Sequence, residues 1–127
     1  MSVYHQDNLL KTYKIALGFS PSGAKEKEGD GKTPEGIYFI SHKNNKSRFH
    51  LSLKISYPNE KDLKNAKQKN FSAGDNIMIH GLSPSTNWIG ELYTQKDWTL
   101  GCIAVTNPEI EEIFSATSVG TKVEIRP

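Results

Sequence analysis

The chain has 127 residues, a net charge of +2 at pH 7 and 35% hydrophobic residues. This length is typical of one domain with its own core, and we expect a single domain over residues 1–127. The small net charge argues against a nucleic-acid or anionic-membrane partner, and no apolar run approaches the ~20 residues that span a bilayer. The first residues enter a strand-like pattern directly, without a charged and apolar leader, so we expect the natural N-terminus to lie further upstream.

The first half of the chain alternates short β patterns with turn residues. Strands are predicted at residues 3–4, 9–17, 37–40 and 49–55, separated by a hairpin turn at 5–8, a loop at 19–32 and turns at 33–36 and 41–46. The residues Thr33-Pro34-Glu35-Gly36 have Pro and Gly where a type I turn prefers them. Residues 49–55 alternate apolar and polar side chains, which is typical of a strand with one buried face.

The second half adds helical patterns. The sequence predicts a polar helix at 60–68, a buried strand at 76–80, a long loop at 81–95, a helix from 107 to about 116 and an alternating strand at 121–125. Asn107 is predicted to cap the second helix, with Pro108 in its first turn and acidic residues behind them. The lysines of the first helix region predict a solvated basic face: Lys61, Lys64, Lys67 and Lys69. The expected fold class is mainly β with one or two short helices.

Cys102 is the only cysteine, and it follows Gly101 and precedes an apolar run. A single cysteine forms no internal disulfide, and with a histidine elsewhere it is a candidate nucleophile. A histidine that accepts the thiol proton would leave a thiolate, the reactive form of cysteine. The alternative is that Cys102 is a small buried residue with no catalytic role.

His80 is the predicted general base. It closes the apolar run Ile77-Met78-Ile79 and is followed by Gly81, whereas His5 and His42 lie in turn-like polar stretches and His50 lies on the polar phase of its strand. A histidine at the end of a buried strand is held rigidly, and the glycine after it allows another chain or a substrate to approach the backbone. The alternative is that His80 is a buried histidine whose ring nitrogens form hydrogen bonds within the protein and have no catalytic role.

The residues around Cys102 give further candidates. The N–H groups of Gly101 and Cys102 are predicted to bind a developing oxyanion, a role that competes with a plain turn glycine. Thr99 is expected to bond either the backbone or the substrate. Trp98 is expected to lie in the core or to floor a groove, and Asp97 to bind an amine or cap a turn.

Other classes of site fit the sequence poorly. One cysteine and scattered histidines give no metal-ligand cluster, so neither a metal nor another cofactor is expected. The glycines between Gly29 and Gly36 follow no strand and lack the spacing of a phosphate-binding loop. A papain-like protease places its cysteine early and its histidine late, which is the reverse of the order here.

The motifs resemble those of the YkuD-type L,D-transpeptidases, in particular the YafK-like branch. The family signature of His-Gly followed by Ser/Thr-His-Gly-Cys is similar to His80-Gly81 and Thr99-Leu100-Gly101-Cys102. Further similar segments are Glu28 to Gly36, Leu53 to Asn59, and Ile77 to Gly81. The sequence departs from the common motif at Leu100, in place of the second histidine, and at Ala104, in place of Asn or Arg.

The resemblance implies a YkuD-like β-sandwich or barrel and a cysteine acyltransferase of cell-wall biogenesis and cell shape. Peptidoglycan stem peptides would be the substrate, with Cys102 as nucleophile, His80 as base and the Gly81 carbonyl orienting the histidine ring. The alternatives are a hydrolase that trims stem peptides or releases a peptidoglycan-linked lipoprotein, and a non-catalytic cell-wall binding module. The implied location is the periplasm or cell wall. The oligomeric state is left open.

Overall fold

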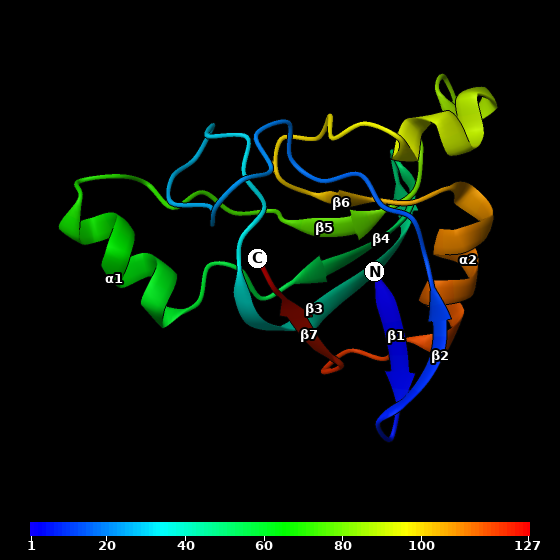
Figure 1. Ribbon diagram of the computed structural model, residues 1–127, viewed down its shortest axis with the longest axis horizontal. Helices are drawn as coiled ribbons and strands as arrows, with labels where there is room; N and C mark the ends of the chain where they lie inside the picture. Colours follow the sequence, from blue (N-terminus) through cyan, green and yellow to red (C-terminus); the bar gives the residue numbers. More distant parts are fainter.

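The computed structural model describes residues 1–127, and its centre is a curled five-stranded sheet (Figure 1). The strand order is β6-β5-β4-β3-β7, and β5 and β6 are the one pair that runs parallel. The strands are β3 (Gly36–Ser47), β4 (His50–Ile55), β5 (Met78–His80), β6 (Ile103–Ala104) and β7 (Lys122–Ile125). The prediction of a mainly β domain with short helices is confirmed.

A second, two-stranded sheet is formed by β1 (Ser2–His5) and β2 (Asn8–Thr12). The two residues between the strands, Gln6 and Asp7, both have positive φ, as a tight hairpin turn requires. The predicted strand at 9–17 is therefore too long, because the ladder ends at Thr12. The chain then crosses to the large sheet, where Ala16 forms an isolated bridge with Ala104.

Strand β3 is longer than predicted, since residues 41–46 continue the strand instead of turning. These residues pair with β4, for example Lys43 with Leu53 and Asn44 with Ser52. Their side chains are mostly exposed and polar, so no apolar alternation marks the strand in the sequence. The turn falls instead between Ser47 and His50, and His50 has a positive φ of 74°.

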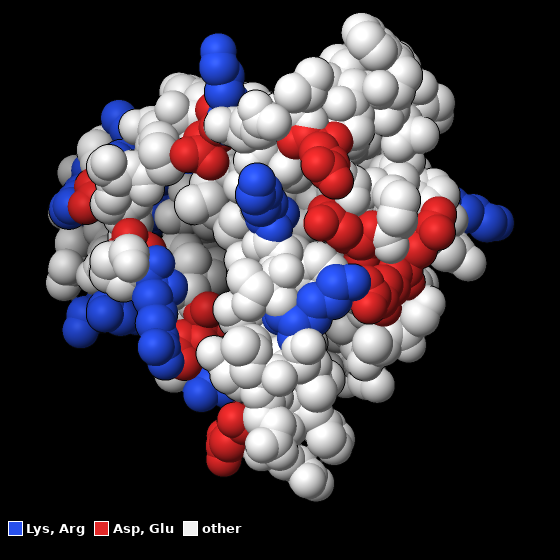
Figure 2. Space-filling view, turned by 45° about the vertical axis from the view of Figure 1, so that its right-hand side comes forward, with Lys and Arg blue, Asp and Glu red and all other residues white.

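Helix α1 (Glu60–Gln68) has the predicted bounds and projects from one end of the sheet (Figure 1). Asn59 caps it: the Asn59 side chain accepts from the Asp62 N–H, and the Asp62 carboxylate accepts from the Asn59 N–H. The Tyr38 hydroxyl of β3 donates to the same Asp62 carboxylate at 2.9 Å, which ties the helix to the sheet. The four lysines of this region are exposed, and Figure 2 shows basic side chains gathered on the side where α1 lies.

Helix α2 (Asn107–Ala116) packs on β4 and buries Ile110 and Ile113. Its N-cap is Thr106 and not Asn107, so the predicted cap is wrong by one residue. The Thr106 N–H donates to the Glu109 carboxylate at 2.9 Å, while the Asn107 side chain binds elsewhere. None of the helices combines the length and the hydropathy needed to cross a membrane.

The loop predicted at 81–95 contains η1 (Asn87–Thr94), two 3₁₀ turns on either side of Gly90. It stands out from the body of the protein at the upper right of Figure 1. Trp88 on this segment is 82% exposed, because its ring lies outside the core.

The two faces of the sheet differ where β4, β5 and β6 meet. Leu53, Ile79 and Ile103 pair in one row and belong to a core of 14 buried hydrophobic residues. The next row pairs Ser52 with His80 and His80 with Ala104, and all three residues are buried. Because successive side chains of a strand point to opposite faces, this second row lies on the other face from the core row.

Candidate active site

His80 ends β5 in a nearly closed environment and is 2% exposed. Its neighbours across the sheet, Ser52 and Ala104, are small, which leaves room for the imidazole. The ring stacks on Phe49 with 4.3 Å between centroids and makes a T-shaped contact with Trp98 at 6.2 Å between centroids. The rotation of the His80 ring is therefore restricted from two sides.

The tautomer of His80 follows from its hydrogen bond. The Nδ1 atom lies 2.6 Å from the Gly81 carbonyl oxygen, and a carbonyl accepts only, so Nδ1 carries the hydrogen. The Nε2 lone pair is then free to accept a proton. Burial lowers the pKa of His80, and Arg48 acts in the same direction, whereas the bond to Gly81 raises it. His80 is therefore a neutral base at neutral pH.

Gly81 is fixed by close packing rather than by an unusual backbone conformation. A Cβ at this position would lie 2.5 Å from Asn107 Oδ1 and 2.8 Å from a methyl carbon of Ile110. Asn107 Oδ1 in turn accepts from the Leu82 N–H at 2.7 Å. The start of α2 therefore braces the segment that follows His80, and this is the function of the Asn107 side chain.

Thr99, Gly101 and Cys102 form a tight turn before β6. The Thr99 hydroxyl donates to the Cys102 carbonyl at 2.7 Å and accepts from the Gly101 N–H at 3.1 Å. Gly101 has a φ of +135°, and a Cβ there would lie 2.7 Å from the Lys32 carbonyl oxygen, so the position requires glycine. The Gly101 N–H thus has a partner inside the turn, whereas the Cys102 N–H has none in the protein.

The Cys102 thiol lies against the edge of β5. Its Sγ donates to the Asn76 carbonyl at 3.4 Å. Burial raises the pKa of Cys102, while the Met78 N–H and the Lys25 ammonium lower it. Since His80 pairs with Ala104, the register sets Cys102 beside Met78, about 6–7 Å along the strand from His80. No hydrogen bond joins Cys102 to His80 in this conformation.

The other predicted candidates bind the protein itself. The Trp98 indole N–H donates to the Tyr93 carbonyl at 2.9 Å, and the ring is partly buried beside His80. The Asp97 carboxylate accepts from the Leu17 N–H at 2.7 Å, so it joins two segments that are distant in the sequence and does not cap a local turn. Thr99 is 3% exposed and acts on the backbone.

Two large apolar side chains are exposed near Cys102. Phe19, whose N–H donates to the Thr99 carbonyl, is 54% exposed, and Leu100 is 77% exposed. A groove lies on the other side, next to the segment that follows His80. The groove, of about 820 Å³, is lined by Ser47, Arg48, His50, Leu82, Pro84, Asn87, Asn107, Pro108 and Glu111. Within the groove His50 and Glu111 are paired at 2.7 Å, and the Arg48 guanidinium lies over the Phe49 ring.

Several site residues carry no functional signal in the sequence. The pattern marks Phe49 only as a strand residue, Asn76 as the start of a strand and Asn107 as a cap. Their roles depend on contacts between distant segments, which a single sequence does not display. No three His, Cys, Asp or Glu side chains are arranged to hold a metal ion.

The sequence matches a known family along nearly the whole chain. The family model of the YkuD L,D-transpeptidase catalytic domain matches residues 1–125. The chain belongs to the YkuD family. In this family context, Leu100 lies exposed on the Cys102 turn and Ala104 lies buried beside His80.

Known relatives of this YkuD domain are longer proteins. YafK of Escherichia coli strain K12, named as a candidate L,D-transpeptidase, is 33% identical over 111 residues, covering 86% of this chain and 37% of YafK. The helical cell shape determining protein Pgp2 of Campylobacter jejuni is 28% identical, with a TM-score of 0.66 over 93% of this chain and 38% of Pgp2. The chain thus spans less than two fifths of either protein.

A more distant structure has the same fold. An L,D-transpeptidase of Mycobacterium smegmatis aligns with a TM-score of 0.62 at 12% identity, over 99% of this chain and 53% of that chain. At this identity the likeness shows the fold alone, and the predicted YkuD-like architecture is confirmed.

Proposed function

We propose that this domain is a cysteine-dependent L,D-transpeptidase that acts on peptidoglycan stem peptides. The observation that carries the proposal is the parallel pairing of β5 with β6 in a YkuD domain. This pairing brings the Cys102 turn alongside the strand that ends in His80. The tautomer of His80, with a free Nε2, supports its role as the base.

The proposed reaction begins with a proton transfer. The Cys102 side chain leaves the Asn76 carbonyl, turns toward His80 and gives its proton to Nε2. The thiolate attacks the carbonyl of the diamino-acid residue before the terminal D-alanine, so that a C–S bond forms. The Cys102 N–H supplies an oxyanion donor. As the C–N bond breaks, the imidazolium of His80 gives its proton to the leaving D-alanine amine.

The acyl-enzyme thioester is then resolved by a second nucleophile. An amine of another stem peptide attacks the thioester carbonyl, passes a proton to His80 and releases Cys102, which gives a cross-link. Water in the same place would give hydrolysis, either of a stem peptide or of a linkage to a lipoprotein. The groove beside Arg48 supports an amine acceptor that also carries carboxylates. Such substrates lie in the periplasm or cell wall, where we expect the protein to act.

The test is mass spectrometry of purified disaccharide-tetrapeptides and lipoprotein-linked muropeptides after incubation with the protein. A dimer that has lost D-alanine supports the transpeptidase. Loss of D-alanine or release of the lipoprotein fragment without a dimer would establish a hydrolase instead. Binding without any product would identify a non-catalytic module.

Two variants test the roles of the residues. Cys102→Ala should lower turnover more than about a thousandfold, because no other thiol exists in the chain. His80→Asn should lower it by about 10²–10⁴-fold, which is the usual contribution of general acid–base catalysis. His42→Asn is the matched control, since His42 is exposed and bonds only Ser41. Turnover that persists in Cys102→Ala would overturn the mechanism.

A further inference from the structure

A buried ion pair lies in the loop of residues 25–33, outside the residues assigned above. Lys25 Nζ and Asp30 Oδ1 are 2.9 Å apart, and their side chains are 3% and 8% exposed. A buried pair is expensive to desolvate and contributes little net stability, so its presence calls for another reason.

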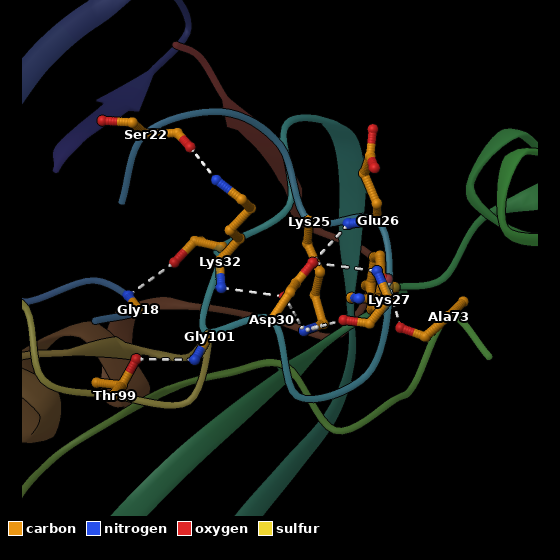
Figure 3. Close-up of polar contacts among 12 residues, drawn as sticks. Gly18, Ser22, Lys25, Glu26, Lys27, Asp30, Lys32, Ala73, Thr99 and Gly101 are labelled. Atoms are coloured by element: carbon orange, nitrogen blue, oxygen red, sulfur yellow. Dashed lines mark hydrogen bonds and ion pairs between the residues drawn. The ribbon is translucent and has the colours of Figure 1, made fainter. Parts of the chain in front are cut away.

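Asp30 organises the whole loop. Figure 3 shows Asp30 at the centre of contacts with Lys25, Glu26, Lys27 and Lys32. One carboxylate oxygen binds the Lys25 ammonium and the Lys32 N–H, and the other binds the Glu26 and Lys27 N–H groups at 2.9 and 3.1 Å. Lys25 Nζ also donates to the Lys27 carbonyl at 3.1 Å. Both oxygens of the Asp30 carboxylate are therefore bonded, and together they fix the path of the loop.

The loop packs directly behind the Cys102 turn. The Lys32 carbonyl oxygen occupies the space in which a Gly101 side chain would lie. The Thr33 hydroxyl accepts from the Gly18 N–H at 3.0 Å, and Gly18 bridges to Thr99. In Figure 3 the Thr99–Gly101 contact lies beside the loop that Asp30 closes. A change in the loop is therefore transmitted to the turn through backbone contacts.

The charges around Cys102 come from few side chains. Strand β5 contributes His80, which is neutral, and Asp75 before it is exposed and paired with Lys54. The Lys32 ammonium donates to the Ser22 carbonyl and extends away from Gly101 in Figure 3. Burial raises the pKa of the Cys102 thiol, and the Lys25 ammonium acts in the opposite direction because its positive charge favours the thiolate.

We propose that the buried Lys25–Asp30 pair is a positioning element of the active site, which sets the loop of residues 25–33 against the Cys102 turn and holds the Lys25 ammonium within that loop. The inference rests on the proposed role of Cys102 as nucleophile. Asp30 holds the ammonium in place, and Lys25 offsets part of the cost that burial imposes on the thiolate. Both side chains are buried, so they act through the loop and the turn.

The test is the rate of Cys102 alkylation by iodoacetamide as a function of pH. The informative variant is Lys25→Gln/Asp30→Asn, which replaces both charges with amides, because removing one partner alone leaves a buried unpaired charge. We expect alkylation at pH 7 to slow by roughly threefold to tenfold and the midpoint of the pH profile to rise. Lys25→Arg retains the charge and should keep the original profile.

The matched control is Lys69→Gln, which removes an exposed ammonium paired with Glu26 at 2.7 Å and should leave the profile unchanged. A folded Lys25→Gln/Asp30→Asn variant with an unshifted profile would overturn the inference. If that variant does not fold, the ¹³Cε signal of Lys25 can be followed with pH in the unaltered chain. An inflection that disappears in Cys102→Ala supports the coupling, and a signal without this inflection contradicts it.

Alkylation needs no peptidoglycan, so the two proposals can fail separately. A shifted profile with no reaction on muropeptides would leave the Lys25 effect standing and remove the proposed function. Turnover that depends on Cys102, together with an unshifted profile, would keep the function and remove the role of Lys25.

Discussion

Gly81, next to the proposed base His80, is closely packed, and its lack of a Cβ is what allows this packing. Its Cα faces Asn107 and Ile110, and a Cβ would also lie 3.0 Å from the Phe49 carbonyl. Gly81→Ala should therefore lower the free energy of unfolding by about 1–3 kcal/mol, because the start of α2 must move away. Urea denaturation of the two proteins measures this difference.

Gly29 provides the comparison for this prediction. It has a φ of +79°, but a Cβ at this position would meet nothing within 4 Å, so Gly29→Ala meets backbone strain alone. That strain should cost about 1 kcal/mol or somewhat more. A neutral Gly81→Ala would contradict the close packing of α2 against Gly81.

The candidate nucleophile and base could be found from the sequence, but their surroundings could not. A lone cysteine after a glycine and a histidine that closes an apolar run are local signals. The Asn76 carbonyl, which accepts a hydrogen bond from the Cys102 thiol, and Phe49, which stacks on His80, come from other parts of the sequence. The sequence predicts a loop at 19–32, yet only the fold shows that Asp30 of this loop pairs with a buried lysine.

Helix α1 depends on Asp62 more than on its cap. The Asp62 carboxylate accepts from the Asn59 N–H at 3.0 Å and from the buried Tyr38 hydroxyl. Burial, with Asp62 beside it, raises the pKa of Tyr38, so the phenol remains a donor. We expect Asn59→Ala to lower the free energy of unfolding by about 1 kcal/mol and Asp62→Ala by about 2–3 kcal/mol. The latter also removes the 2.9 Å acceptor of the buried Tyr38 hydroxyl and leaves it only the Glu35 carbonyl at 3.4 Å.

Chemical denaturation of both variants checks this ranking, with Lys64→Ala on the exposed side of α1 as the control. Equal losses for Asn59→Ala and Asp62→Ala would show that the contact with Tyr38 contributes nothing. The expected effect of the control is within about 0.5 kcal/mol of zero.

At the level of elements, helices were predicted better than strands. The bounds of α1 agree because its cap and its polar pattern are local. The extension of β3 was missed because its paired residues are exposed and polar, and the early end of β2 was missed because an apolar pattern continues past Thr12. Strand bounds are set by the partner strand, and no partner is visible in one sequence.

The stability of the whole molecule should fall in acid in two steps. Burial alone would raise the pKa of Asp30, but the Lys25 ammonium and three backbone N–H groups outweigh it and lower that pKa to about 2, from an ordinary value of 3.8. The unfolded chain therefore takes up this proton first as the pH falls. The resulting stabilisation, about 2 kcal/mol, is complete above about pH 5 and lost between about pH 5 and 2.

His80 is responsible for the first loss of stability as the pH falls, at a higher pH than that of Asp30. Burial lowers its pKa, so the unfolded chain binds a proton near pH 6.5 while the folded protein does not. Unfolding free energies measured from about pH 7 to 2 should decline first in the His80 range and again in the Asp30 range. In Lys25→Gln/Asp30→Asn the second decline should be reduced, and an unchanged acid profile would contradict the assignment to Asp30.

The two tryptophans occupy opposite environments. Trp88 is almost fully in solvent on η1, whereas the Trp98 ring makes T-shaped contacts with the Tyr93 and His80 rings. A chain with Trp88→Phe would contain one indole, in contact with the proposed base. An imidazolium quenches indole emission more strongly than a neutral imidazole does. The protein therefore carries its own optical reporter of the proton on His80, and no label is needed to follow it.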